Sequence, residues 1–231
     1  SLVGSEMCIR DRAVTPYGKK AKVSINDSAL TITKADSLLV LLSGGTNYST
    51  ETANYRTNES VLHQRIDDII NKALAKNYTT LKTRQQKSHR MLFDRCQLSI
   101  TPDDCNTKPT PQLVADYNKT DSSYLDNHFL EELYFNYGRY LLISCAQGIA
   151  LPSNLQGIWN YSNSAVWHCD IHANINVQMN YWPAEVTNLS ELHNNLLDYI
   201  YNEALIHTQW RDNVNTVLRS ANKNENQKPV S

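Results

Sequence analysis

Residues 174–185 read NINVQMNYWPAE, and the fold of the second half of the chain depends on how this stretch is interpreted. Amides occupy every second position, with apolar residues between them: Asn174, Asn176, Gln178 and Asn180. Taken alone, this strict alternation predicts a strand. Amides offer donors and acceptors without net charge, which suits a neutral ligand rich in hydroxyl groups. A polar network that satisfies itself would use the same residues.

Tryptophans and polar side chains are concentrated in the wider segment of residues 151–185. Three of the four tryptophans of the chain lie there, interleaved with Asn, Gln, Asp and His: Trp159, Trp167 and Trp182. An aromatic face stacks on the C–H face of a sugar ring, while amides, carboxylates and imidazoles bond its hydroxyls. The composition therefore favours carbohydrate binding.

Two other kinds of chemistry are disfavoured in this segment. His168 and His172 have the spacing of the metal-binding histidines of H-E-x-x-H, but Cys169 stands where that motif has glutamate. Cys169 and His168 are adjacent, so their side chains are poorly placed to act as nucleophile and base. A serine nucleophile would need G-x-S-x-G, which is missing from the sequence. We expect no metal site.

Helices are predicted on both sides of the segment. Residues 124–144 carry Phe129, Leu133, Tyr137 and Tyr140 on one face and a narrow polar stripe of His128, Glu132, Asn136 and Arg139, which predicts a largely buried helix. A second helix is predicted from a capping box at Asn188–Glu191 to about Trp210. Its apolar side consists of Leu192, Leu196, Ile200 and Ala204.

The first half of the chain reads as strands followed by helices. Strands are predicted over residues 22–49, with a turn at 26–28, alternation at 29–33, an apolar run at 38–42 and an end at Gly44-Gly45. Helices are predicted from a cap at Asn58 or Ser60, through Leu62, Ile66, Ile69 and Ala73, and again from 80 to 94. Residues 96–100 could form a short strand, and residues 101–123 read as a connecting loop.

The bulk properties exclude several classes of partner. The chain has 231 residues, 41% hydrophobic and 19% charged, with a formal net charge of −1. Such a balance predicts no attraction to nucleic acid or to an anionic membrane, and no apolar run is long enough to span a bilayer. Cys96 and Cys105 are either a disulfide pair or free thiols. The sequence does not indicate whether the protein is a monomer or an oligomer.

Three ordered motifs resemble glycoside hydrolase family 95, the α-L-fucosidases that act mainly on terminal α-1,2-linked fucose. They are YFNYGRYLLISCA, LPSNLQGIWN and WHCDIHANINVQMNYWPAEVTNLSELH, and the likeness extends over residues 124–212. The family has paired α-helices where residues 174–181 alternate. The resemblance therefore predicts a helix for this stretch, against the strand that the alternation suggests.

The resemblance also implies a multidomain fragment that is truncated at both ends. It places the last strands of an all-β sandwich-like domain at 13–52, a helical linker at 53–122, and the first helices of an all-α (α/α)6 barrel at 123–231. Residues 1–12, SLVGSEMCIRDR, share no pattern with the rest and resemble a translated sequencing-adaptor remnant. We expect these twelve residues to be foreign to the fold.

Family members hydrolyse with inversion, which needs an acid on the leaving oxygen and a base-activated water on the opposite face of the ring. Asn174 and Asn176 match the asparagine pair that holds this water, and His172 matches a fucose-contacting residue. Asp170 would either orient His172 or bond the sugar, and Trp167, in a Ser/Asn-rich loop, would line the cleft.

Other residues of the segment are expected to be structural. Gln178 and Asn180 should bond backbone or neighbouring helices, Trp159 and Trp182 should pack in the core, and Glu185 should not be the acid. The acid glutamate and the aspartate that polarises the asparagines are expected beyond Ser231, so we expect this fragment to be inactive and to fold poorly.

The resemblance implies a fucosylated glycan as substrate, no cofactor, and an extracytoplasmic location, periplasmic or secreted. Two alternatives remain open at this stage. One is an α-L-galactosidase or another (α/α)6 glycosidase, because a pocket that tolerates one extra hydroxyl discriminates weakly. The other is a non-catalytic carbohydrate-binding protein that has kept the aromatic cleft.

Overall fold

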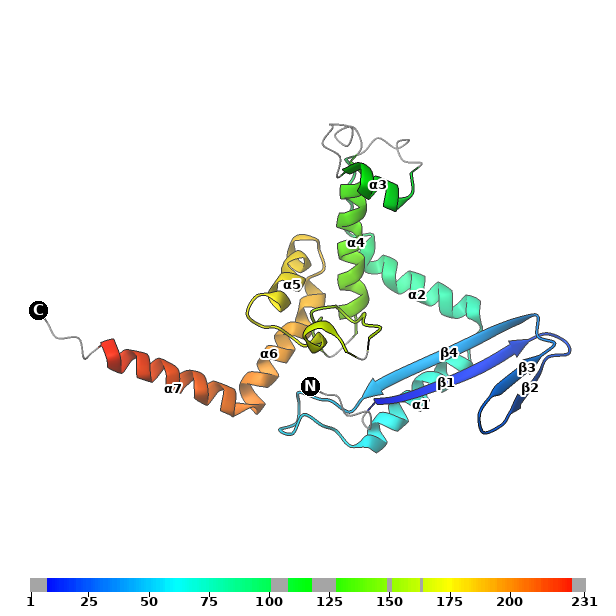
Figure 1. Ribbon diagram of the computed structural model, residues 1–231, viewed down its shortest axis with the longest axis horizontal. Helices are drawn as coiled ribbons and strands as arrows, with labels where there is room; N and C mark the ends of the chain where they lie inside the picture. Colours follow the sequence, from blue (N-terminus) through cyan, green and yellow to red (C-terminus); the bar gives the residue numbers. More distant parts are fainter. Residues whose placement is uncertain (1–7, 101–107, 118–127, 149–150, 163, 226–231) are drawn as a thin grey trace, which may run out of the picture. The chain divides into compact units, whose positions relative to one another are not determined.

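The computed structural model describes residues 8–100, 108–117, 128–148, 151–162 and 164–225. The chain divides into two compact units, whose helices and strands are labelled in Figure 1. The first unit consists of residues 1–86 and 202–231, and the second of residues 87–201. Each unit has its own packing and is described by itself.

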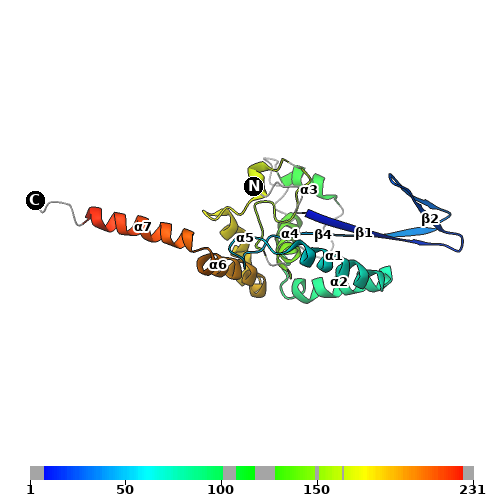
Figure 2. The ribbon, with the colours of Figure 1, turned by 90° about the horizontal axis from the view of Figure 1, so that it is seen from below.

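The first unit contains two antiparallel strand pairs. Strand β1 (Cys8–Tyr17) pairs with β4 (Ser37–Thr46) along its whole length, with Cys8 opposite Thr46 and Tyr17 opposite Ser37. Strands β2 (Lys22–Ile25) and β3 (Leu30–Thr33) form a hairpin that lies between β1 and β4 in sequence. The hairpin branches off at the end of the longer pair where β1 stops and β4 starts (Figure 2). The Asn26 side chain accepts the backbone N–H groups of Ser28 and Ala29, as expected of an Asx turn. The predicted strands and turn are thus confirmed.

One expectation about these strands was wrong. Gly44 and Gly45 do not end the strand, because β4 continues through both to Thr46. A Cβ atom at Gly45 would lie 3.1 Å from Leu62 Cδ1, so the glycine instead lets helix α1 approach the sheet closely. Strand β1 begins at Cys8, so residues 8–12 take part in the backbone ladder with β4, and the origin of residues 1–12 in a sequencing adaptor stays a prediction.

Helix α1 (Glu59–Leu74) begins where the sequence predicts, with the Asn58 side chain accepting the Ser60 N–H at 2.9 Å. It packs on β1 and β4 and buries Leu62, Ile66 and Ile70. Ile69, which the predicted face included, is 50% exposed, because the buried residues recur every four positions and Ile69 lies at the edge of the face that they form.

Helix α2 (Tyr78–Phe93) agrees with the second predicted helix, but the segments after it differ from expectation. Residues 96–100 form no strand. Their backbone forms hydrogen bonds with side chains of helix α4 instead. The Arg139 guanidinium donates to the Cys96 carbonyl, and the Glu132 carboxylate accepts the Ile100 N–H.

Part of the predicted loop at 101–123 is helix α3 (Thr110–Tyr117), with Pro111 in the first turn, where proline is tolerated, and Leu113 buried. Cys96 is a free thiol, and Cys105 lies outside the described residues.

The core of the second unit lies between α4 (Phe129–Ala146), α5 (Asn176–Val186), the 3-10 turn η4 (Ser190–His193) and α6 (Asn194–Ile206). Its buried members come from these elements and their neighbours: Leu92, Leu142, Ile143, Cys145, Ala146, Val177, Tyr181, Ala184, Leu189, Leu192 and Leu196. The predicted faces of α4 were wrong. Arg139, placed in the polar stripe, is 1% exposed, whereas Tyr137 on the predicted apolar face is 53% exposed.

The predicted helix from 188 to 210 is interrupted twice. Residues 190–193 form the 3-10 turn η4 rather than α-helix. Helix α6 then ends at Ile206, and helix α7 (Thr208–Glu225) begins after the non-helical residue His207. The capping box does not form, because Asn188 has a positive φ of 59° and the Glu191 carboxylate pairs with Arg95. Leu192 and Leu196 are buried as predicted, but Ile200 is exposed.

The chain therefore combines a strand-rich start with a helical remainder, as expected at the coarse level. The β-sandwich-like domain, the linker boundaries and the (α/α)6 barrel stay predictions. Across the described ranges, no helix has both the length and the hydropathy that a membrane span needs.

Candidate functional site

The amide-rich stretch is helical. Helix α5 begins at Asn176, so the strand suggested by the alternation was wrong and the helix implied by the family resemblance is confirmed. Residues two positions apart point in different directions on a helix, whereas residues four apart share a face. Asn176 and Asn180 therefore lie on one side, Gln178 lies on another, and Asn174 precedes the helix.

The four amides fall into two pairs by their partners. Gln178 Nε2 donates to the Ala173 carbonyl at 2.6 Å, and Asn180 Nδ2 donates to the carbonyls of Asn154 at 2.9 Å and Ser153 at 3.3 Å. The prediction that Gln178 and Asn180 bond backbone is confirmed. Asn174 is exposed and Asn176 half-buried, and within the described part of the chain neither side chain has a hydrogen-bond partner. The first pair of amides is thus free to bind something else.

His172 is held on both its side chain and its backbone. Its Nδ1 lies 2.7 Å from Asp170 Oδ1, and its carbonyl accepts the Val177 N–H at 3.0 Å, in the first turn of α5. A carboxylate on Nδ1 favours a proton on that nitrogen and leaves Nε2 for a ligand. Of the two roles considered for Asp170, the geometry favours the orientation of His172.

Trp167, His168 and Cys169 form a left-handed turn before this pair. Their φ angles are 47°, 57° and 56°, within the short 3-10 segment η3 (Val166–Cys169). His168 and His172 therefore do not share a helix face, and the spacing that suggests a metal-binding pair has no helical basis here. Trp167 is 69% exposed. Among the described residues, no cluster of three or more His, Cys, Asp or Glu side chains is arranged to hold a metal ion.

A buried polar network anchors the loop at 151–157 beside α5. The Tyr181 hydroxyl accepts the Ser153 N–H and donates to Asn195 Oδ1, both at 2.9 Å, and Asn195 Nδ2 donates to the Leu151 carbonyl at 3.0 Å. Burial raises the pKa of Tyr181, although the bonds with Ser153 and Asn195 oppose the shift. Burial also raises the pKa of Cys145, whose thiol lies 3.2 Å from Ser153 Oγ.

The sequence alone did not assign Tyr181, Ser153 or Asn195 to the site. The sequence predicted no role for Tyr181, because its hydroxyl partners lie 28 residues before it and 14 after it in the chain. One feature of the sequence could have indicated this network. A tyrosine in a buried helix needs a hydrogen-bond partner for its hydroxyl group, which predicts a polar contact to another segment.

Three further residues of the segment were assigned to structure. Trp159 and Trp182 are 43% and 62% exposed, so their placement in the core was wrong for the chain as described. The Trp159 ring packs over Gly157, where an added Cβ would lie 2.6 Å from it. Glu185 lies 3.1 Å from His193 Nδ1, in agreement with a structural role.

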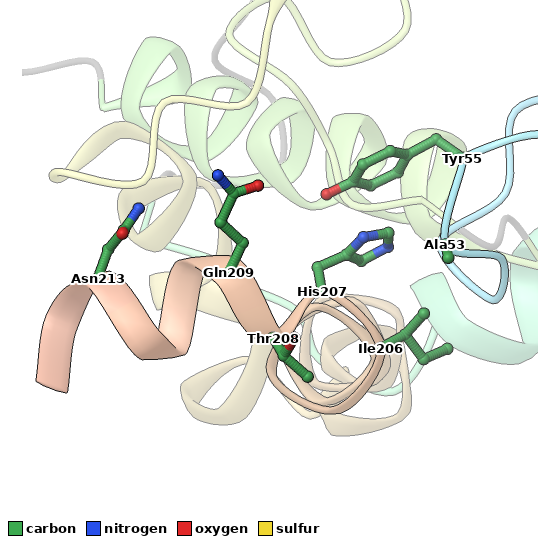
Figure 3. Close-up of a pocket in the computed structure, with 7 residues that line it drawn as sticks. All are labelled: Ala53, Tyr55, Ile206, His207, Thr208, Gln209 and Asn213. Carbon is green, nitrogen blue, oxygen red and sulfur yellow. The ribbon is translucent and has the colours of Figure 1, made fainter.

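A cavity of about 460 Å³ lies in the other unit and contains none of the predicted site residues. It is lined by Ala53, Tyr55, Ile206, His207, Thr208, Gln209 and Asn213 (Figure 3). The Tyr55 and His207 rings stack at 3.8 Å, and the Tyr55 hydroxyl bonds Glu203 at 2.9 Å. Glu203 Oε1 and His207 Nε2 are buried 4.0 Å apart with no hydrogen bond to either atom.

The part of the chain that carries this segment also matches a known family. Residues 77–221 match the model of the glycosyl hydrolase family 95 catalytic domain. The chain belongs to this family.

Curated relatives extend the comparison. The chain is 33% identical to the probable alpha-fucosidase A of Aspergillus niger over 168 residues, 71% of this chain and 21% of that protein. It is 34% identical to the probable alpha-fucosidase A of Aspergillus oryzae over 71% of this chain and 23% of that protein. Alpha-L-fucosidase 2 of Arabidopsis thaliana is 30% identical over 77% of this chain and 21% of that protein. The chain therefore spans less than a quarter of the length of these relatives.

Proposed function

We propose that this chain supplies the water-holding part of an α-L-fucosidase that removes terminal α-1,2-linked L-fucose from glycans with inversion. Family membership and the names of the relatives support the fucosidase activity. The observation that carries the site assignment is the division among the four amides. Asn174 and Asn176, which follow His172 by two and four positions, have no side-chain hydrogen bond within the described part of the chain. The side chains of Gln178 and Asn180 instead donate hydrogen bonds to backbone carbonyls.

In the proposed mechanism, the carbonyl oxygens of Asn174 and Asn176 orient the attacking water, and His172 binds a hydroxyl of fucose. An amide is a very weak base, so it can position water but cannot keep the proton that the water loses. A carboxylate must accept that proton, and a second group, a carboxylic acid, must protonate the leaving oxygen on the opposite face of the sugar.

The described residues do not supply these two carboxyl groups at the asparagines. Asp170 is paired with His172 and Glu185 with His193, and no carboxylate of the described chain is bonded to Asn174 or Asn176. We therefore propose that the 231-residue chain alone releases no fucose and that the activity belongs to the full-length protein.

The test measures fucose release from a trisaccharide with a terminal Fuc-α-1,2-Gal unit, using the full-length protein and its Asn176→Ala variant. Loss of the water-orienting amide should lower kcat by on the order of 100-fold or more, as expected when a reactant is no longer held in the reactive geometry. Asn194→Ala is the matched control, because Asn194 is an exposed amide outside the proposed site. The stereochemistry of the first product, followed by NMR, tests inversion.

Each outcome separates the alternatives. Fucose release that is unchanged in Asn176→Ala would remove the water-holding role. Release of L-galactose in preference to fucose would assign the site to an α-L-galactosidase. Sugar binding by a folded full-length protein without hydrolysis would indicate a carbohydrate-binding protein.

We further propose that the full-length protein acts outside the cytoplasm, because the family's glycan substrates are extracellular. Cell fractionation with an antibody against this chain tests the location. Recovery in the cytoplasmic fraction alone would contradict it.

A further inference from the structure

We propose that Trp167 is the stacking platform for the sugar that carries the fucose, on the leaving-group side of the bond that is cleaved. The inference rests on the proposed function and adds a specificity-determining residue to it. It follows from the turn that holds Trp167, from the exposure of its ring, and from its position before the Asp170–His172 pair.

The turn is a costly way to build a loop. Trp167, His168 and Cys169 all have positive φ angles, between 47° and 57°, and none of them is glycine. The left-handed conformation costs an L-residue roughly 1–2 kcal/mol, and it is rare for bulky side chains. Such strain persists where surrounding contacts enforce it, and it is concentrated at functional sites.

Several contacts enforce this conformation. The His168 N–H donates to the Ala165 carbonyl at 3.0 Å, and the Asp170 N–H donates to the Trp167 carbonyl at 3.3 Å. The neighbouring loop adds two more contacts, from the Leu155 N–H to the Asp170 carbonyl and from the Cys169 thiol to Gln156 Oε1. This loop is itself fixed by Tyr181 and Asn195.

Packing does not explain the position of the indole. Trp167 is 69% exposed, and among the described residues no ring stacks on it and no cation lies over it. A strained and braced turn thus holds a large aromatic surface out to solvent. Such a surface is suited to binding rather than to the core.

The exposure of the ring indicates which sugar it binds. An enzyme that removes a terminal residue encloses that residue, and the next ring lies at the mouth of the site. His172 and the two asparagines would hold the enclosed fucose, so the exposed indole is left for the ring beyond it. A galactose ring, with its axial hydroxyl on one side, offers a continuous C–H face on the other, and such a face stacks on indole.

The experiment compares two substrates that share the fucosyl group and differ in the leaving group. Fuc-α-1,2-Gal carries the second ring, whereas α-L-fucosyl fluoride carries none. In the full-length protein, Trp167→Ala should lower kcat/KM for the disaccharide roughly threefold to tenfold, as expected for the loss of one stacking contact. The same change should leave kcat/KM for the fluoride within twofold, and Trp167→Phe should restore most of the disaccharide activity.

Tyr161→Ala is the matched control, because Tyr161 is a fully exposed aromatic residue without a positive φ angle. Equal losses on both substrates in Trp167→Ala would overturn the proposal, since the indole would then act on fucose or on the fold. Unchanged activity on both substrates would overturn it as well. A wild-type protein that hydrolyses neither substrate would instead refute the proposed function on which the inference rests.

Discussion

Tyr181 shows how one hydroxyl group can position a loop that carries no regular structure. Its oxygen is both an acceptor, for the Ser153 N–H, and a donor, to Asn195. Asn195 in turn donates a hydrogen bond to the Leu151 carbonyl. The Tyr181 side chain of α5 therefore connects this helix to both α6 and residues 151–153. Because Tyr181 is 2% exposed, water cannot replace these bonds.

We therefore expect Tyr181→Phe to destabilise the chain by about 1–3 kcal/mol, the cost of leaving a buried donor and acceptor unpaired. The ring itself stays, so packing changes little. Urea denaturation followed by circular dichroism measures the loss. Tyr137→Phe is the control, because Tyr137 is 53% exposed, and it should change stability by less than about 0.5 kcal/mol. Equal stability of both variants would show that the hydroxyl network contributes nothing.

At the scale of elements, Arg139 joins α4 to the end of α2. Its guanidinium donates to the carbonyls of Leu92, Phe93 and Cys96 at 3.0, 2.6 and 2.7 Å and lies over the Phe93 ring. The last carbonyls of a helix lack partners within the helix and carry its negative dipole end, so a cation is favourable there. Burial lowers the pKa of Arg139, with Cys96 and Asp94 opposing the shift.

Two effects oppose each other when this arginine is replaced. Arg139→Met removes a buried charge, which relieves desolvation, but it also leaves the Phe93 and Cys96 carbonyls without a donor and the Leu92 carbonyl with only the Arg95 N–H at 3.4 Å. Since each unpaired buried group costs about 1–3 kcal/mol, the second effect should dominate, and we expect a net loss of about 2–3 kcal/mol.

Arg139→Lys should lose less, because it keeps the charge but lacks the planar fork. Arg84→Met, an exposed change on helix α2, is the control for the urea denaturation that measures these losses. A more stable Arg139→Met protein would show that the cost of desolvating the guanidinium outweighs the three hydrogen bonds it donates.

Local patterns in the sequence predicted the elements whose causes are local. The Asx turn at Asn26 and the cap at Asn58 each depend on neighbours within a few residues. The alternation at 174–181 failed because spacing alone does not reveal what each amide contacts. Asn180, for example, bonds carbonyls 26 and 27 residues earlier in the chain.

Features with distant causes could not be predicted from the sequence. Arg139 looked like a surface residue because its three partners lie 43 to 47 residues before it. Gly45 looked like a strand end because the helix that packs on it begins only at Glu59. Asp170 lies within hydrogen-bond distance of His172, which accords with one of the two roles considered for it, and its role stays a prediction. The roles of Asn174 and Asn176 stay predictions.

At the scale of the whole molecule, buried groups with raised pKa values link stability to alkaline pH. Burial raises the pKa of Tyr48 and Tyr181 above the ordinary 10.0, and that of Cys145 above the ordinary 9.0. In the unfolded chain these groups lose their protons at the ordinary values, while the fold retains them. The folded state therefore binds more protons above about pH 9, and the free energy of unfolding must fall as pH rises there.

Each group that is protonated in the fold and ionised in the unfolded chain contributes a slope of up to about 1.4 kcal/mol per pH unit. Urea denaturation at a series of pH values from neutral to alkaline measures the slope. Cys145→Ala should reduce it from the start of the alkaline range, and Tyr181→Phe should reduce it only at higher pH, because its ordinary pKa is one unit above that of cysteine. Tyr161→Phe, which removes a fully exposed hydroxyl, is the control. Stability that rises with pH in this range would mean that the fold favours the ionised forms, and the network around Ser153 would then have to hold a tyrosinate or a thiolate.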